Sequence, residues 1–381
     1  EMLHVCQYEE SDFQFISRWL EREGMYFYFE QGEDKEKLII TDHKGDHNEL
    51  RSEAARYVPY SGGSDDRMSL EAFNSFRCRR NMLPAQVKLD DYDYMNPPLE
   101  LEQSADVDGA AQISRYGDNY RTAGDGGRLA TVRAEQYLAT KKVFNGEGRV
   151  FELRPGYFFK LEEHPQTSLN ETYLCTRLIH TGNQQAESRE VKDMLEIYQD
   201  DEYRVTCDAI LAETQDRHPF RTKIPRVDGV IHAVVDGPSD SDYAQLDDQG
   251  RYKVKIFLDE SGLKDGNAST WIRMLQWHAG GTEGVHFPLR KGTEVLIIFL
   301  GGDPDRPMIC GAAPNPQKPS PVTSNNHTWN ILQTGGGNYL AIQDAADKQY
   351  IDLYCPMKNT YLHLGETHDD YLDNHTHNII L

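Results

Sequence analysis

The alternation of apolar and polar positions predicts a small β-barrel between Gly250 and Asn315. From Tyr252 to Leu258 every second residue is apolar, and the residues between them are mostly charged, which is typical of a strand with one buried face. The unbroken apolar run Val295–Leu300 favours a strand covered on both faces. Further β-rich pieces lie at 227–235, 271–274 and 308–311. Together they make about five strands, the size of an oligonucleotide/oligosaccharide-binding (OB) barrel.

The N-terminal part of the chain predicts a helix followed by a hairpin. Ser11 with Gln14 three residues later forms a capping-box pattern, and Gly24 ends the predicted helix. Three apolar residues share one side of that helix: Phe13, Ile16 and Leu20. The β-rich runs Met25–Glu30 and Lys37–Thr41 then predict two strands.

Further β-rich runs alternate with turns up to a proline-marked stretch near 214–219, where we expect a domain boundary. The runs between Met68 and Leu101 suit a second barrel module. A helix is predicted from 126–130 to near Lys142. Its buried stripe would consist of Leu129, Val132 and Leu138. Later strands are expected at 153–161, 170–176 and 195–205.

The segment after the proline-rich linker 314–321 has a different pattern. Short apolar alternations recur there about every ten residues, at Leu340/Ile342, Ile351/Leu353/Cys355, Leu362/Leu364 and Ile379/Leu381. Such short strands with few large apolar groups cannot enclose a core by themselves. The segment therefore needs neighbouring chains. In an assembly we expect six of these residues to point inward: Leu340, Ile342, Ile351, Leu353, Leu362 and Leu364.

Composition and charge limit the function classes. The 381 residues suggest two or three domains. Against 40 Lys and Arg there are 62 Asp and Glu, so phosphate backbones and anionic lipids would be repelled. The OB segment 221–318 has 12 basic and 13 acidic residues. This near-neutral balance does not predict the basic groove that binding of single-stranded nucleic acid requires. Trp271 and Trp277 could stack bases, but we interpret them as core residues.

Cysteine usage and the chain ends suggest an intracellularly made protein that is part of a longer one. The six cysteines are scattered without a Cys-x-x-Cys pair, which favours buried thiols over a zinc site or a disulfide framework. No apolar run approaches a membrane span and no signal peptide is present. Met2–Cys6 is already typical of a strand, and Ile379–Leu381 lies within a patterned segment, so we expect neither end to be natural.

Four motifs in the OB segment closely resemble one family in content, order and spacing. They are Gly250–Lys255, Trp271–Met274, Pro288–Leu296 and Gly302–Gly311, and they resemble the OB domain of VgrG, the spike of type VI secretion systems. Residues from Gln7 to Glu30 resemble the family's hub domain, which is similar to phage tail hubs. The C-terminal pattern resembles the start of the family's needle, where three chains wind strands into a triangular β-prism.

The resemblance implies a mainly β fold with hub barrel modules and a few helices at 1–216, an OB barrel at 217–318, and the start of a trimeric β-prism or β-helix needle at 319–381. It also implies a homotrimer made in the bacterial cytoplasm and secreted through the type VI apparatus. Its partners would be the Hcp tube at the hub end and a PAAR-repeat tip protein or an effector at the needle end.

The chain shows no motif for catalysis or cofactor binding, so we predict a structural puncturing device that is not an enzyme. The alternative is a cell-wall glycosidase of the tail-hub type. Its carboxylate pair would have to come from candidates such as Asp90–Asp91 or Asp200–Asp201. A carbohydrate- or nucleic-acid-binding OB protein is a further alternative.

Three other motifs have simpler structural interpretations. Gly124–Gly127 lacks the lysine of a phosphate loop and is interpreted as a loop and helix start. His164 precedes a proline and is interpreted as a turn residue.

A histidine cluster consists of His363, His368, His375 and His377. His375 and His377 would present six imidazoles in a trimer, a possible metal cage, but a hydrated polar turn is the simpler interpretation.

Overall fold

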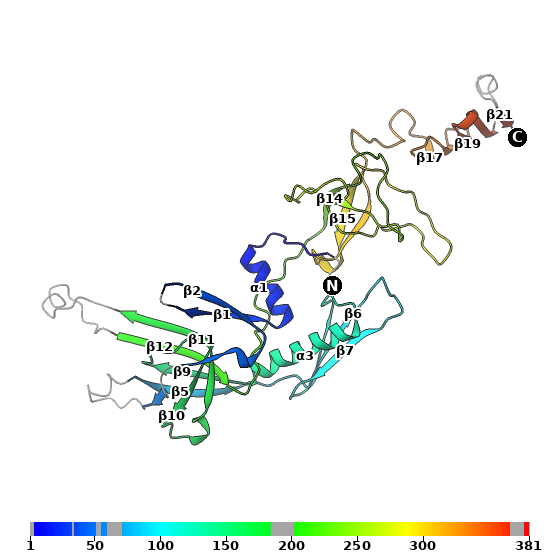
Figure 1. The fold of residues 1–381 in the computed structure, drawn as a ribbon. Coiled ribbons are helices and arrows are strands. Elements are labelled where there is room, and N and C mark those ends of the chain that lie inside the picture. Colours follow the sequence, from blue (N-terminus) through cyan, green and yellow to red (C-terminus); the bar gives the residue numbers. More distant parts are fainter. Residues whose placement is uncertain are drawn as a thin grey trace. The chain divides into compact units, whose positions relative to one another are not determined.

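The computed structural model describes residues 4–32, 34–50, 55–58, 71–183, 202–365 and 377–380. The chain divides into two compact units, Glu10–Ile224 and a second unit that combines Glu1–Glu9 with Pro225–Leu381. Strands dominate both units (Figure 1), so the predicted mainly β class is confirmed. In the parts that the structure describes, no helix has the length and apolar character needed to cross a membrane.

The first unit begins with the predicted helix and hairpin. Helix α1 (Asp12–Glu23) has a complete capping box, because the Ser11 hydroxyl accepts from the Gln14 amide and the Gln14 side chain accepts from the Ser11 amide. Gly24 ends the helix with φ +79°, a conformation that favours glycine. Strands β1 (Tyr26–Gln31) and β2 (Glu36–Thr41) then pair antiparallel.

The apolar side of α1 faces solvent in this unit. Phe13 and Ile16 are 66% and 53% exposed, whereas Ser17 and Arg18 are the buried residues of the helix. The Phe13 ring packs edge-on against Phe27 of the hairpin at 5.9 Å. The spacing therefore predicted the helix correctly, but burial follows the polar side that meets the rest of the unit.

A seven-stranded sheet and a three-stranded sheet form the body of this unit. The larger sheet, in the order β11-β12-β9-β5-β4-β10-β3, contains β3 (Asn48–Glu49), β4 (Ala55–Tyr57), β5 (Ala72–Arg80), β9 (Lys142–Gly148), β10 (Tyr157–Glu162), β11 (Thr172–Asn183) and β12 (Glu202–Leu211). The smaller sheet, in the order β7-β6-β8, contains β6 (Gln86–Asp91), β7 (Leu101–Asp106) and β8 (Gln112–Tyr116). Short 3₁₀ turns are η1 (Lys44–Asp46) and η2 (Thr167–Leu169).

The predicted second module between Met68 and Leu101 is therefore split between two sheets. Its first strand, β5, joins the larger sheet, and β6 joins the smaller one. The larger sheet packs around an aromatic core that includes Phe73, Phe76, Phe144, Phe159 and Tyr173. The Tyr173 ring lies 4.7 Å from Phe144 and 5.0 Å from Phe76, so aromatic contacts supply much of the burial.

Helix α3 (Ala123–Ala139) covers the smaller sheet and starts earlier than predicted. Thr122 caps it by accepting from the Asp125 amide at 3.1 Å, so Gly124–Gly127 lies in its first turns and not in a loop. Leu129 is fully buried and Val132 nearly so, as predicted. Leu138 is only half-buried, because the last turn lies at the edge of the packed face.

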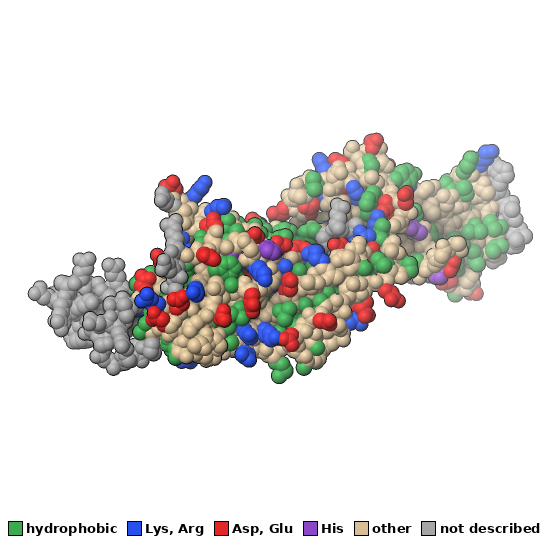
Figure 2. Space-filling model, turned by 60° about the horizontal axis from the view of Figure 1, so that its bottom comes forward, with side chains coloured by type: hydrophobic (Ala, Val, Ile, Leu, Met, Phe, Trp, Pro, Cys, Tyr) green, Lys and Arg blue, Asp and Glu red, His purple; other side chains and the backbone are tan. Residues whose placement is uncertain are grey.

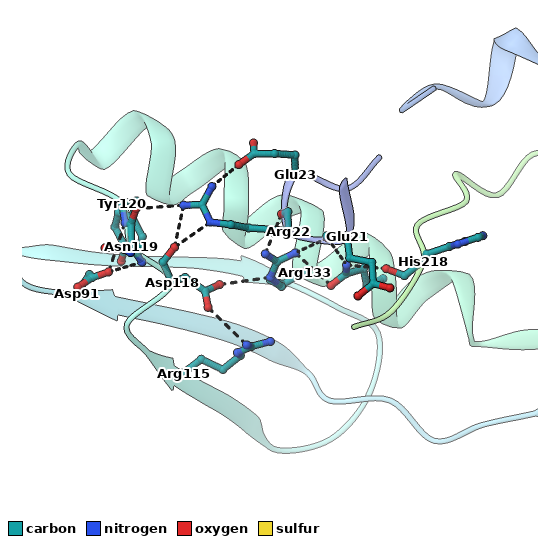
Figure 3. A network of polar contacts seen from close by, with 11 residues as sticks. Glu21, Arg22, Glu23, Asp91, Arg115, Asp118, Asn119, Tyr120, Arg133 and His218 are labelled. Carbon is teal, nitrogen blue, oxygen red and sulfur yellow. Dashed lines mark hydrogen bonds and ion pairs between the residues drawn. The ribbon is translucent and has the colours of Figure 1, made fainter. Parts of the chain in front are cut away.

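A buried arginine on α3 connects the separate segments of this unit (Figure 3). Arg133 is 1% exposed and donates to the Asp118 carboxylate at 3.3 Å and to the Arg22 carbonyl of α1 at 2.8 Å. Its guanidinium lies 4.2 Å from the centre of the Phe220 ring. Desolvation lowers the pKa of Arg133 to about 10, so the group stays charged at neutral pH and depends on these partners.

The second unit contains the predicted barrel. Four strands pair in the order β14-β13-β15-β16: β13 (Val230–Val235), β14 (Val254–Ile256), β15 (Glu294–Phe299) and β16 (Pro307–Ala312). Isolated bridges join Tyr252 to Ile272 and Met274 to Ile309, which extends pairing around the barrel. The turn η3 (Leu300–Gly302) separates β15 from β16.

Three details of the barrel differ from the sequence prediction. Strand β14 is short, and Leu258 lies in a turn with 59% exposure. In β15 only one face is fully buried, through Val295 and Ile297, whereas Leu296 and Ile298 are half-buried. Trp277 is 85% exposed and is not a core residue. Trp271 is half-buried and lies 5.0 Å from the Lys253 ammonium.

Residues 4–8 belong to the barrel unit and form no strand. Residues 4–8 have no regular secondary structure, and residues 1–3 of the predicted strand lie outside the described ranges. The Cys6 amide donates to the Asp305 carboxylate at 2.6 Å, and Tyr8 packs against the barrel core. The division between the units, after Ile224, lies somewhat beyond the boundary expected at residue 216.

Removing the buried arginine should destabilise the first unit strongly. Arg133→Met leaves the buried Asp118 carboxylate and two carbonyls without this donor, so we expect a loss of about 3 kcal/mol in unfolding free energy. Arg128→Met is the matched control, because Arg128 lies on the same helix, is half exposed and pairs with Glu23; its loss should be about 0.5 kcal/mol. Denaturant unfolding measures both, and equal losses would contradict the role of Arg133.

Acid should weaken the first unit through His47. The buried His47 ring donates from Nδ1 to the Gly156 carbonyl at 2.9 Å and accepts at Nε2 from the Tyr26 hydroxyl at 2.6 Å, so it is neutral. Desolvation lowers the pKa of His47 below its ordinary 6.5. Stability is therefore present above pH 6.5 and is lost as the pH falls toward the folded-state pKa.

The measurement is the melting temperature between pH 7.5 and pH 5. The drop should be smaller in His47→Gln than in the unchanged chain, because glutamine does not titrate. His43→Gln, at an exposed position, should leave the drop as it was. An unchanged pH dependence in His47→Gln would show that other groups cause the drop.

Candidate assembly surface

The C-terminal part of the second unit is a five-stranded sheet in sequence order. Its strands are β17 (Trp329–Gln333), β18 (Tyr339–Gln343), β19 (Tyr350–Cys355), β20 (Thr360–Gly365) and β21 (His377–Ile380), with the turn η4 (Met357–Asn359) between β19 and β20. The first four strands pair antiparallel, and β21 pairs parallel with β20. The first four strands follow one another by short turns, so this part of the sheet forms from local pairings.

One face of this sheet is aliphatic. The register aligns Leu332, Leu340, Leu353 and Leu362 in one row across four strands. A second row on the same face aligns Ile342, Ile351 and Leu364. The six residues predicted to point to one side therefore share a face, and that part of the prediction is confirmed.

The aliphatic face is exposed in the chain. Leu353 is 47% exposed, Leu332 44% and Ile351 39%. A groove of about 650 Å³ runs along one of the rows and is lined by Leu332, Leu340, Leu353 and Leu362 together with Phe287 of the barrel. An exposed, continuous apolar face on a sheet marks an interaction surface.

The opposite face carries aromatic and polar side chains, and the chain covers it itself. Tyr339 stacks on Tyr354 at 4.9 Å, and Tyr361 lies 6.2 Å from Tyr354. Between the aromatic residues, the Asp352 carboxylate and the His363 Nδ1 approach to 2.6 Å, and these residues are only 4% and 1% exposed. The usual arrangement is thus reversed, because the polar pair is inside and the aliphatic residues are outside.

The predicted histidine cluster is not brought together as a metal site by the described residues. His363 is buried against Asp352, and His368 and His375 lie outside the described residues. The backbone of His377 belongs to β21, but its side chain is not among those described. Within the ranges given above, no three His, Cys, Asp or Glu side chains are grouped as metal ligands.

The other candidate residues have structural roles where they are described. Asp91 is buried and accepts from the Tyr92 amide at 2.8 Å and the Asn119 amide at 2.6 Å, whereas Asp90 is exposed. As successive residues of β6 they point to opposite faces and cannot act as a glycosidase pair. Asp200 and Asp201 lie outside the described residues. His164 accepts from the Gln166 amide at 3.0 Å, which confirms its interpretation as a turn residue.

The surface charge does not suggest a nucleic-acid site. Acidic and basic side chains are interspersed over the face drawn in Figure 2. The exposed Trp277 could stack on a base, yet the barrel segment 221–318 has 12 basic and 13 acidic residues. The described surface that departs most from an ordinary soluble face is therefore the aliphatic face of β17–β20.

Comparison with known proteins identifies the family. Residues 2–186 match the phage tail baseplate hub (GPD) family, and residues 242–313 match the type VI secretion system/phage-baseplate injector OB domain. The type VI secretion system spike protein VgrG1b of Pseudomonas aeruginosa is 30% identical over 329 residues, which cover 84% of this chain and 43% of that protein. The chain belongs to the VgrG family.

Other VgrG proteins match over a longer part of the chain. The actin cross-linking toxin VgrG1 of Vibrio cholerae is 26% identical over 384 residues, 97% of this chain and 33% of that protein. A solved Francisella PdpA-VgrG complex aligns with 94% of this chain and 55% of its own, at a TM-score of 0.52 and 9% identity, which shows a similar fold. The chain spans less than half the length of the two curated relatives named here.

The family resemblance predicted from the motifs is confirmed, and so is the OB fold. The matches to the hub and OB domain families end at residues 186 and 313, so the aliphatic face of β17–β20 lies beyond both.

Proposed function

We propose that this chain forms the hub, the collar and the first needle strands of a homotrimeric cell-puncturing spike, in parts near 1–216, 217–318 and 319–381. The observation that carries the proposal is the exposed aliphatic face of β17–β20, with Ile351 39% and Leu353 47% exposed. Three copies around one axis bury three such faces against one another. Burial of apolar surface then supplies the association energy that one chain lacks.

The work of such a spike is mechanical. A sheath that contracts behind it would push the trimer through a target envelope, so the needle has to resist bending and unfolding. Strands interlocked between three chains have few free edges, which supports that resistance. The names of the relatives support delivery through a type VI apparatus. The hub would contact Hcp rings, and the needle would carry a PAAR-repeat tip or an effector.

The same relatives support the localisation. The chain would be made in the bacterial cytoplasm and secreted through the apparatus into a target cell or the medium, without stable insertion into a membrane.

We also propose that residues 1–381 act without catalysis or a cofactor. The cell-wall hydrolase alternative requires two carboxylates on either side of a sugar bond, and Asp91 is already held by backbone amides.

The trimer is tested by the absolute mass of the purified chain in light scattering. We expect three times the mass of one chain. The mass of a single chain at micromolar protein concentration would contradict the proposal. Ile351→Asp should lower that mass or the melting temperature, because three like charges near one axis cost about 3 kcal/mol or more per trimer. Far-UV β signal should be largely kept, since the hub and barrel strands have local partners.

Lys348→Asp is the matched control for this change. It introduces an aspartate just before β19, at a residue that is exposed and outside the strands of the sheet, so mass and melting temperature should stay unchanged. Deletion after Pro321 should act like Ile351→Asp. If Ile351→Asp behaves like Lys348→Asp, the aliphatic face is not an assembly surface.

The absence of catalysis is tested on peptidoglycan. We expect the purified chain to release no more soluble fragments than buffer does, because Asp91 is held by backbone amides and Asp90 lies on the other face of β6. Turnover that survives purification and disappears in one carboxylate variant, such as Asp91→Asn, would favour the hydrolase.

A further inference from the structure

The aliphatic and aromatic strands of the C-terminal sheet are repetitive enough to pair in more than one register. A slip by one residue turns every side chain to the other face and is strongly disfavoured. A slip by two residues keeps the faces. Moving β19 so that Ile351 lies opposite Leu362 would again pair aliphatic residues on one face. The same slip would place Leu353 opposite Thr360, so on this face the two registers differ by one aliphatic contact.

The turn between β19 and β20 also selects the register weakly. It places Lys358 and Asn359 at φ +53° and +49°, in the left-handed region that glycine and asparagine favour. Lysine has no such preference, so the native turn carries a local cost. A turn shifted by two residues along the chain need not have a higher conformational cost than the native turn.

One pair of side chains does distinguish the registers. In the native pairing Asp352 lies directly opposite His363, and their side chains approach to 2.6 Å in a buried position. Ala341, on the other side of Asp352, is small and 1% exposed, which leaves room for the pair. The His363 ring also stacks on Tyr361 with an interplanar angle of 16° at 6.0 Å.

In either two-residue slip this pair is broken. Asp352 would lie opposite Tyr361 or Gly365, and His363 opposite Tyr350 or Tyr354. A buried carboxylate would then lose its imidazole partner, which is far more costly than an exchange of one aliphatic contact for another. We propose that the buried Asp352–His363 pair sets the register of the C-terminal sheet, acting as the specificity-determining contact between β19 and β20.

This inference concerns contacts within one chain, and it goes beyond the proposed function. For the spike, the consequence is that the two aliphatic rows stay aligned across the strands, so that the rows of three copies can pack against one another. A buried polar pair that fixes register at some cost in stability is a known use of such groups.

Disulfide trapping within the full chain tests the register directly. In a Cys355→Ser background, Leu353→Cys with Leu362→Cys reports the native register, and Ile351→Cys with Leu362→Cys reports a slip. After mild oxidation, peptide mass spectrometry quantifies intrachain cross-links. With Asp352 and His363 present, the native cross-link should exceed the slipped one by about tenfold or more.

Three variants decide the role of the pair. Asp352→Leu with His363→Leu keeps the sheet apolar and should raise the slipped fraction about tenfold. The exchanged pair, Asp352→His with His363→Asp, should restore the native ratio. Tyr339→Leu with Tyr354→Leu, a directly opposed pair of β18 and β19 on the same face, is the control and should leave the ratio unchanged.

The outcomes separate this inference from the proposed function. An unchanged ratio in the double-leucine variant, or a slipped sheet in the exchanged variant, overturns the register role. If the double-leucine variant does not fold, the exchanged pair decides alone: native register supports the role, and slipped or absent cross-links refute it. A monomeric mass with the expected cross-link ratios would refute the spike and leave the register role standing.

Discussion

A sheet has two faces, and the C-terminal sheet of this chain covers only one of them with its own side chains. The covered face holds tyrosines and the buried Asp352–His363 pair, and the uncovered face holds the aliphatic residues. The hydrophobic effect favours the opposite arrangement in a chain that acts alone. In the proposed trimer, the aliphatic faces of three copies would cover one another and form a shared core.

The first unit is held together by contacts within one chain. Its separate segments meet at Arg133, whose guanidinium is shared between a carboxylate, backbone carbonyls and the Phe220 ring. Figure 3 shows Asp118 on one side of this group and Glu21 and Arg22 of helix α1 on another. A buried charge of this kind adds little net stability, but it penalises any arrangement in which one segment is missing. The contrast with the C-terminal sheet is that every partner of Arg133 lies within the unit.

Local sequence patterns predicted the elements well wherever the deciding contacts lie within a few residues. The capping box at Ser11, the left-handed Gly24 and the hairpin after it depend on backbone geometry and on neighbours in the chain. The alternation in residues 339–364 likewise predicted the strands and the shared aliphatic face. Family motifs in the barrel added the OB fold, which periodicity by itself had only suggested.

The sequence by itself determined where most helices and strands form and which of their side chains share a face, because these follow from periods of 3.6 and 2.0 residues. Only the tertiary structure decided which faces are covered. Trp277 was expected to pack inside and is exposed, and His363, expected in a hydrated turn, is buried beside Asp352. Burial depends on segments far away in the chain or on other chains, and a local sequence pattern carries no information about either.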